Sequence, residues 1–300
     1  MQRLRLCENM RALGYAPFYL ALASGHFPAA GLDVQLITSP SASRTGTMLL
    51  EHQADVSWGG PMRVMQHHAA DPDCPLKCFA QVVARDPFVL VGRTPNPTFR
   101  FHDLLGLRVA IATEVPTPWL MLQDDLARAG IDPAALARAD RPTMEEAAQA
   151  LLAGEIDVIQ VFEPLVDALV SAGSHVWHRF TDRGDIAYTT FYAPLWTLDS
   201  NRDACRALVR GMASAQRDFH AADPAAIAAA IHNYFPDLPR PALSRIISTY
   251  RAAGLWARTP DLPPTAFVRL KAALLSGGLI ARDIPYDHLI DAGLSCADPE

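Results

Sequence analysis

A short motif occurs twice in this chain of 300 residues, and it constrains the fold more than any other feature. The letters LLEHQADV at residues 49–56 return as LLAGEIDV at residues 151–158, an offset of 102 residues. In both copies a helical pattern ends, a short polar segment follows, and an aspartate opens an apolar strand. Residues 4–8 and 108–114 match at nearly the same offset, each a strand pattern that ends at a glutamate. A helix before a strand is common in α/β proteins, but two matches at nearly one offset favour two similar lobes.

Between and around these motifs, short apolar segments alternate with longer helical patterns, which is typical of parallel α/β sheets. The predicted strands are residues 3–7, 31–37, 55–58, 77–83, 89–91, 108–112, 157–162 and 189–193. The predicted helices are residues 17–26, 44–52, 61–69, 116–129, 143–153, 163–172, 200–221 and 223–234, followed by a helical cap over 239–300.

We therefore expect an α/β fold with two similar lobes, each a mixed, mostly parallel sheet flanked by helices. Residues 1–88 and 192–300 would form lobe I, which includes a C-terminal helical tail, and residues 89–191 would form lobe II. Two crossover strands would form the hinge. Ligands of open α/β sheets bind where the strands end, so the strand ends of both lobes should face a shared cleft.

Charge and hydropathy limit the classes of partner that we expect for this chain. The net charge of −6 leaves no basic excess for nucleic-acid phosphates, so we expect no nucleic-acid partner. No apolar run reaches the roughly 18 residues of a membrane span. The first seven residues lack the apolar core and cleavage site of a signal peptide. Two locations stay open: cytoplasmic if Met1 is the true start, and periplasmic if an export signal has been removed.

The cysteines predict neither disulfides nor a metal site. Their number is odd and their spacing irregular: Cys7, Cys74, Cys78, Cys205 and Cys296. Residues 74–78, with two histidines upstream, match no standard zinc spacing, and nearby prolines indicate a surface loop. We expect no metal and no cofactor.

Four segments in their order along the chain resemble a known family. They are APFYLALASGHF with AGLDV at residues 16–34, DVSWGGP at 55–61, FHDLLGLRVA at 101–110 and GEIDV leading to FEP at 154–164. Together they resemble the NMT1/THI5-like (SsuA/THI5-like) substrate-binding proteins of ABC transporters. The resemblance implies the type II periplasmic-binding-protein fold from residue 4 to about residue 195.

The resemblance also implies a function. Family members bind thiamine-pyrimidine precursors, sulfonates and taurine, or nitrate-like anions, and pass them to an ABC importer. This chain is thus expected to bind one small polar or planar molecule, with an ABC permease as partner. The alternative is a cytosolic enzyme on the same fold, such as a decarboxylase, desulfinase or dehydratase of a small acid. The catalytic positions of two such enzymes do not match: Gly59 and Arg63 replace the lysine and histidine of a pyrimidine synthase, and Ala12 the cysteine of an aryl sulfinate desulfinase.

Several candidate ligand-binding residues follow the first strands. Asn9 can donate and accept hydrogen bonds, and Tyr15 lies in the loop after it; a loop-holding role for Asn9 is equally open. Gly59 and Gly60 precede a helix, so their backbone could approach an anionic ligand at its N-terminus. Trp58 could stack on a planar ligand or belong to the core.

Three candidates belong to the second lobe. Glu114 and Thr117 lie in residues 113–119, which open the helix after the strand at residues 108–112, and Thr117 either caps that helix or contacts the ligand. Glu163 could accept a hydrogen bond from an amino group of the ligand, or be an acid at a helix N-terminus.

The crossover segments supply the last candidates, Arg85, Thr190 and Tyr192, with polar side chains expected to face the cleft. Arg85 is structural if it pairs with Asp86 or Glu163. If it is unpaired, it would bind a carboxylate, sulfonate or phosphate.

Overall fold

The computed structural model describes residues 1–141 and 143–295, which form two units. Unit 1 comprises Met1–Arg85, Asp185–Arg269 and the described residues from Ile280, and unit 2 comprises Asp86–Gly184 and Leu270–Leu279. The sequence predicted lobe boundaries after residues 88 and 191, whereas the units change after residues 85 and 184. The prediction also assigned residues 270–279 to lobe I, whereas they belong to unit 2.

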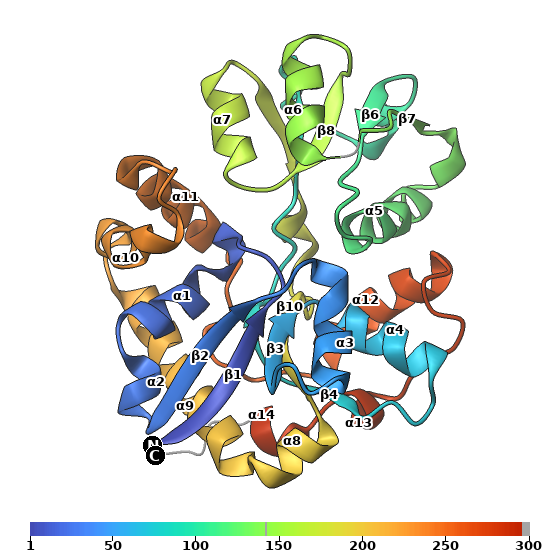
Figure 1. Ribbon diagram of the computed structural model, residues 1–300. Coiled ribbons are helices and arrows are strands. Elements are labelled where there is room, and N and C mark those ends of the chain that lie inside the picture. Colours follow the sequence, from blue (N-terminus) through green and yellow to red (C-terminus); the bar gives the residue numbers. More distant parts are fainter. Residues whose placement is uncertain (142, 296–300) are drawn as a thin grey trace. The chain divides into compact units, whose positions relative to one another are not determined.

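The sheet of unit 1 is five-stranded and mixed (Figure 1). Strand β1 is parallel to β2 and to β3, whereas β10 is antiparallel to both β3 and β4. In spatial order the strands are β2 (Leu32–Thr38), β1 (Gln2–Glu8), β3 (Val56–Gly59), β10 (Thr189–Pro194) and β4 (Leu76–Val83).

The sheet of unit 2 repeats this arrangement. Strand β6 is parallel to β7 and to β8, whereas β5 is antiparallel to β8 and β9. In order the strands are β7 (Ala137–Arg138), β6 (Arg108–Ala110), β8 (Val158–Val161), β5 (Val89–Gly92) and β9 (His175–Arg179). Both sheets thus consist of three parallel strands, one antiparallel strand from the crossover, and a fifth strand beyond it. The predicted fold class is confirmed.

The repeated aspartate has the same structural role in each unit. Asp55 accepts the backbone N–H of Arg5 at 2.7 Å and the Arg5 Nη2 at 2.7 Å. Asp157 accepts the backbone N–H of Arg108 at 3.0 Å and its Nη2 at 2.9 Å. We call these two pairs the Arg–Asp clasps. Each clasp satisfies an otherwise free backbone donor and a cation together, which fixes where the strand after the aspartate starts against its neighbour.

One part of the sequence match has no structural counterpart. Glu8 is the last residue of β1, but Glu114 lies four positions beyond the end of β6 at Ala110. Glu8 is buried and Glu114 is exposed. The glutamates therefore do not correspond, whereas the clasps do.

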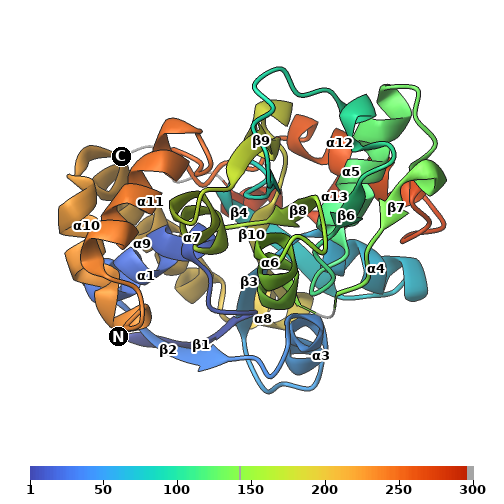
Figure 2. The ribbon, with the colours of Figure 1, turned by 90° about the horizontal axis from the view of Figure 1, so that it is seen from above.

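Helices cover both sheets. In unit 1, α1 packs against α9 and α10, and Figure 2 shows these helices and α11 on one side of β1 and β2. The helices of unit 1 are α1 (Ala16–Ala23), α2 (His26–Ala29), α3 (Thr45–Leu50), α4 (Met62–Ala70), α8 (Leu195–Ser200), α9 (Arg202–Ala221), α10 (Pro224–Ile231), α11 (Arg240–Ala252), α13 (Tyr286–Leu289) and α14 (Ala292–Ser295). Those of unit 2 are α5 (Thr117–Arg128), α6 (Met144–Leu152) and α7 (Leu165–Ser171), while α12 (Thr265–Ser276) has residues in both units. Short 3₁₀ turns join them, including η1 (Leu13–Tyr15).

Two strands were missing from the sequence prediction, and one predicted loop is different. Strand β7 has only two residues, and β9 mixes apolar with basic side chains at an edge, so neither shows a clear period. Cys74 and Cys78 are both buried, and Cys78 lies within β4, so residues 74–78 are not a simple surface loop. Cys296 lies outside the described residues.

Candidate functional site

A buried arginine lies at the carboxyl edge of the sheet in unit 1. Strand β3 ends at Gly59, and Gly60 and Pro61 lead into α4. Arg63 is in the first turn of α4 and is only 6% exposed. Its Nη1 lies 3.4 Å from the hydroxyl of Thr45, the first residue of α3. Among the described residues no carboxylate forms an ion pair with Arg63.

This position is electrostatically unfavourable for a cation. The N-terminus of a helix carries partial positive charge, which repels a guanidinium and attracts an anion. Burial adds a desolvation cost that a neighbouring acid would normally offset. Arg63 has a hydroxyl as its hydrogen-bond partner instead of an acid. The site therefore lacks one negative charge, and a small anion would supply it.

Two predicted residues lie beside Arg63. The hydroxyl of Tyr192 is 2.5 Å from that of Thr45, which places both hydroxyls next to the guanidinium. A side chain at Gly59 would put a Cβ 3.3 Å from both Arg63 Nη1 and the Tyr192 hydroxyl. Glycine thus leaves this space open between the end of β3 and β10.

Asn9 and Tyr15 form a second pair near the same cluster. The Asn9 amide donates to the Tyr15 hydroxyl at 3.0 Å, and its Oδ1 accepts the Met10 backbone N–H at 2.9 Å. Burial raises the pKa of Tyr15, although the Asn9 hydrogen bond and the charge of Arg63 oppose this. Tyr15 is therefore a neutral phenol at pH 7. Asn9 both holds its loop and orients this phenol.

A nearby acid, Glu8, has its own cation and hydrogen-bond donors within the fold. Glu8 is buried at the end of β1 and forms an ion pair with Arg11 at 2.5 Å. Tyr19 and Thr38 each donate a hydroxyl to it at 2.7 Å. Burial alone would raise the pKa of Glu8, but these donors outweigh burial and lower it. Arg11 is thus neutralised within the fold, whereas Arg63 is not.

The other predicted residues of unit 1 have structural surroundings. Trp58 is fully buried and stacks on Phe18 with ring centroids 4.2 Å apart, so it belongs to the core. Thr190 is fully buried in β10. Arg85 pairs with Asp185 at 2.8 Å and donates to the Ala253 carbonyl at 3.2 Å. The sequence had suggested Asp86 or Glu163 as its acid partner, and the partner is Asp185 instead. Because Arg85 is paired with an acid, its role is structural.

The acids of unit 2 hold helix N-termini. Glu163 is buried, and its Oε2 accepts the Asp167 backbone N–H of α7 at 2.9 Å. Glu114 accepts the backbone N–H of Met144, the first residue of α6, at 2.8 Å. Thr117 opens α5 without a side-chain capping bond, so capping does not account for it.

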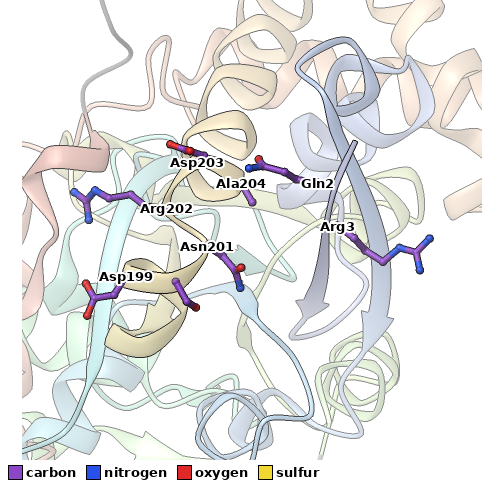
Figure 3. A pocket seen from close by; sticks show the side chains of 8 residues that line it. Gln2, Arg3, Asp199, Asn201, Arg202, Asp203 and Ala204 are labelled. Carbon is purple, nitrogen blue, oxygen red and sulfur yellow. The ribbon is translucent and has the colours of Figure 1, made fainter.

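The hollow shown in Figure 3 lies at the opposite, amino end of the unit 1 strands. Its volume is about 270 Å³, and none of the predicted site residues line it. Its two arginines point away from each other, and each has an acid: Arg3 pairs with Asp33 and Arg202 with Asp291, both at 2.8 Å. Neither arginine of this hollow therefore lacks an acid partner that an anion would replace.

Sequence reasoning missed the two residues at the centre of this cluster, Arg63 and Thr45. A signal was present, because an arginine in the first helical turn after Gly-Gly-Pro opposes the helix dipole.

Within the described residues, no group of three His, Cys, Asp or Glu side chains could hold a metal ion. No helix among them is long and apolar enough to cross a membrane.

Comparisons with known proteins agree with this architecture. Residues 13–226 match the model of the family described as NMT1/THI5 like. The Bacillus subtilis (strain 168) protein named "Putative binding protein YtlA" is 24% identical over 294 residues, which cover 97% of this chain and 88% of that one.

Two solved structures show the same fold at low identity. The periplasmic aliphatic sulphonate binding protein SsuA from Escherichia coli superposes with a TM-score of 0.77 at 17% identity, covering 98% of this chain and 99% of that one. The desulfurization enzyme DszB superposes with a TM-score of 0.69 at 13% identity, covering 98% of both chains. The chain therefore belongs to the NMT1/THI5-like family, and it has the fold of the type II periplasmic binding proteins.

Proposed function

We propose that this protein is a solute-binding protein whose ligand is a small molecule with an anionic group, held by Arg63. The observation that carries the proposal is a guanidinium that is 6% exposed, lies at a helix N-terminus and has no acid within ion-pair distance in the described parts of the chain. Thr45 and Tyr192 add hydroxyls at the same place. The proposal includes two further steps. The two lobes close on the ligand, and the protein delivers the ligand to an ABC permease.

The donor types favour some ligands over others. A guanidinium and hydroxyl groups suit a sulfonate, a carboxylate or nitrate, each of which presents several acceptor oxygens. The name of SsuA describes that protein as a sulphonate binder, which supports this choice within the predicted range. A neutral pyrimidine would leave the charge of Arg63 without a counter-ion.

The enzyme alternative receives less support from the cysteines. Cys7 lies within β1, is fully buried, and burial raises its pKa to about 11. A thiol needs its thiolate form to act as a nucleophile, and this environment disfavours that form. The other described cysteines are buried as well.

The test is a thermal-shift titration with methanesulfonate, acetate, nitrate and a neutral aminopyrimidine. A ligand at 100 times its dissociation constant should add about 2.7 kcal/mol of stability. We expect an anion to stabilise the natural protein and the control Arg3→Met, whose arginine lies at the amino end of β1. Arg63→Met should lose at least about 100-fold in affinity.

Three outcomes would overturn the proposal. The first is an Arg63→Met variant that binds the anion as well as the natural protein does. The second is stabilisation by the neutral pyrimidine alone. The third is chemical consumption of the bound compound on incubation, which would favour the enzyme.

A further inference from the structure

A histidine lies one helical turn from Arg63. Arg63 and His67 are four residues apart on α4, so they share one face of the helix. Both side chains lie against the first turn of α3: Arg63 contacts Thr45, and the His67 ring packs on Gly46. A Cβ at Gly46 would overlap Nε2 of His67, so the close packing needs glycine.

In the described part of the chain, the charged or titratable groups that act on His67 are basic, and no acid is among them. On its own helix, the charged or titratable groups that act on it are Arg63 and His68. Helix α3, which packs on the same side, has the sequence TGTMLL and contributes no charged side chain. The hydrogen bonds found among the described residues include none to the His67 ring, so neither ring nitrogen has a protein partner there.

We propose that His67 is a second, proton-dependent anion-binding group of this site, so that binding of a small oxyanion is accompanied by uptake of one proton. The inference rests on the proposed function, because it assigns a regulation to the same site. Arg63 would supply the permanent charge, and His67 a charge that appears when the anion arrives.

The direction of the pH effect follows from linkage. Burial, and then the charge of Arg63, lower the pKa of His67 in the empty site. His67 is therefore neutral at pH 7 before binding, and a bound anion raises its pKa. Between the lower pKa of the empty site and the higher pKa of the occupied one, one proton is taken up per anion. Over that interval the dissociation constant rises by up to about tenfold per pH unit, and affinity is lost as the pH rises through the occupied-state pKa.

The experiment is isothermal titration of the whole chain with methanesulfonate, whose own charge does not change between about pH 5.5 and about pH 8. Measurement in two buffers of different ionisation enthalpy counts the protons taken up on binding. We expect up to one proton per anion and weaker binding at the higher pH. His67→Gln should bind with a dissociation constant that no longer depends on pH. His220→Gln is the matched control, since burial also lowers the pKa of His220, on α9.

The outcomes separate this inference from the proposed function. If methanesulfonate binds through Arg63 with no proton uptake by the natural protein, the inference about His67 is wrong and the proposed function stands. The same holds if His67→Gln keeps the full pH dependence. If methanesulfonate does not bind at any pH in the range, both are wrong for sulfonates.

Discussion

The two units share a strand arrangement but differ in the charge that follows their third strand. In unit 1, β3 leads to Arg63 in the first turn of α4; in unit 2, β8 leads to Glu163, which accepts a backbone N–H of α7. An acid at a helix N-terminus is stabilised by the dipole and a cation is destabilised. The acid of unit 2 thus serves its own fold. The cation of unit 1 does not, which is why we assign it to a ligand.

A second contrast lies at the points where the chain passes between the units. Arg85 and Asp185 form an exposed pair in unit 1, with side chains 34% and 70% exposed. Asp86 and Arg183 form a buried pair in unit 2, where Asp125 also accepts from Arg183 at 2.7 Å. Neighbouring residues at the same two crossovers therefore make one solvated and one buried ion pair.

The largest predicted effect tests this second contrast. Asp86→Ala removes a buried partner of Arg183 and the acceptor of the Phe88 N–H, and should lower the free energy of unfolding by about 3 kcal/mol. Asp185→Ala, the exposed counterpart, should cost less than about 1 kcal/mol. Urea unfolding with an unchanged m-value measures both. Equal costs would contradict the distinction between a buried and an exposed pair.

The next effect tests the shared Arg–Asp clasps. Asp55→Ala and Asp157→Ala each leave a backbone N–H and a guanidinium without their acceptor, so each should cost about 2 kcal/mol. Hydrogen exchange should place the loss in unit 1 for the first variant and in unit 2 for the second. A large cost for only one of them would mean that the clasps are not equivalent.

The clasp of unit 2 also has a predicted pH dependence. Hydrogen bonds from Arg108 lower the pKa of Asp157 to about 2. A carboxyl group with a lowered pKa in the folded state stabilises above its unfolded value and loses this as the pH falls through the folded value. The stability difference between the natural protein and Asp157→Asn should therefore shrink from about pH 4 toward about pH 2. A difference that stays constant over that range would contradict the assignment.

The smallest effect has opposite signs in the two units. Arg63→Met removes a buried cation without an acid and should raise the stability of the ligand-free protein by about 1 kcal/mol. Glu163→Gln weakens a helix N-terminal contact and should lower stability by about 0.5 kcal/mol. Thermal unfolding without ligand compares them. A clear loss of stability in Arg63→Met would indicate a structural role for Arg63.

The sequence predicted the architecture well because the repeated aspartate has the same physical role in each unit. In each clasp the aspartate binds an arginine about 50 positions earlier, and the offset of 102 residues between the two motifs located both sheets. The glutamate match failed, because an identical letter at a strand end says nothing about which loop follows. Strand β9 was missed because its basic residues hide the apolar period.

The site was predicted only in part, for a reason that concerns tertiary contacts. The structure brings the candidates Gly59 and Tyr192 together on the neighbouring strands β3 and β10, and their contact with a ligand stays a prediction. Arg85 was open between two roles because its partner, Asp185, lies 100 residues away. Arg63 was overlooked although its place in the first helical turn was a signal, because the lack of an acid partner among the described residues emerges only from the packed chain.

The most direct test of the central claim is anomalous diffraction from crystals soaked in selenate, a sulfate analogue whose selenium scatters strongly. We predict a selenium peak at the end of β3, where the selenate oxygens can accept hydrogen bonds from the Arg63 guanidinium and the Thr45 hydroxyl. Crystals of Arg63→Met should lack that peak. An Arg63 guanidinium paired with a carboxylate of the protein, with selenate only elsewhere, would contradict the claim that the missing counter-ion is the ligand.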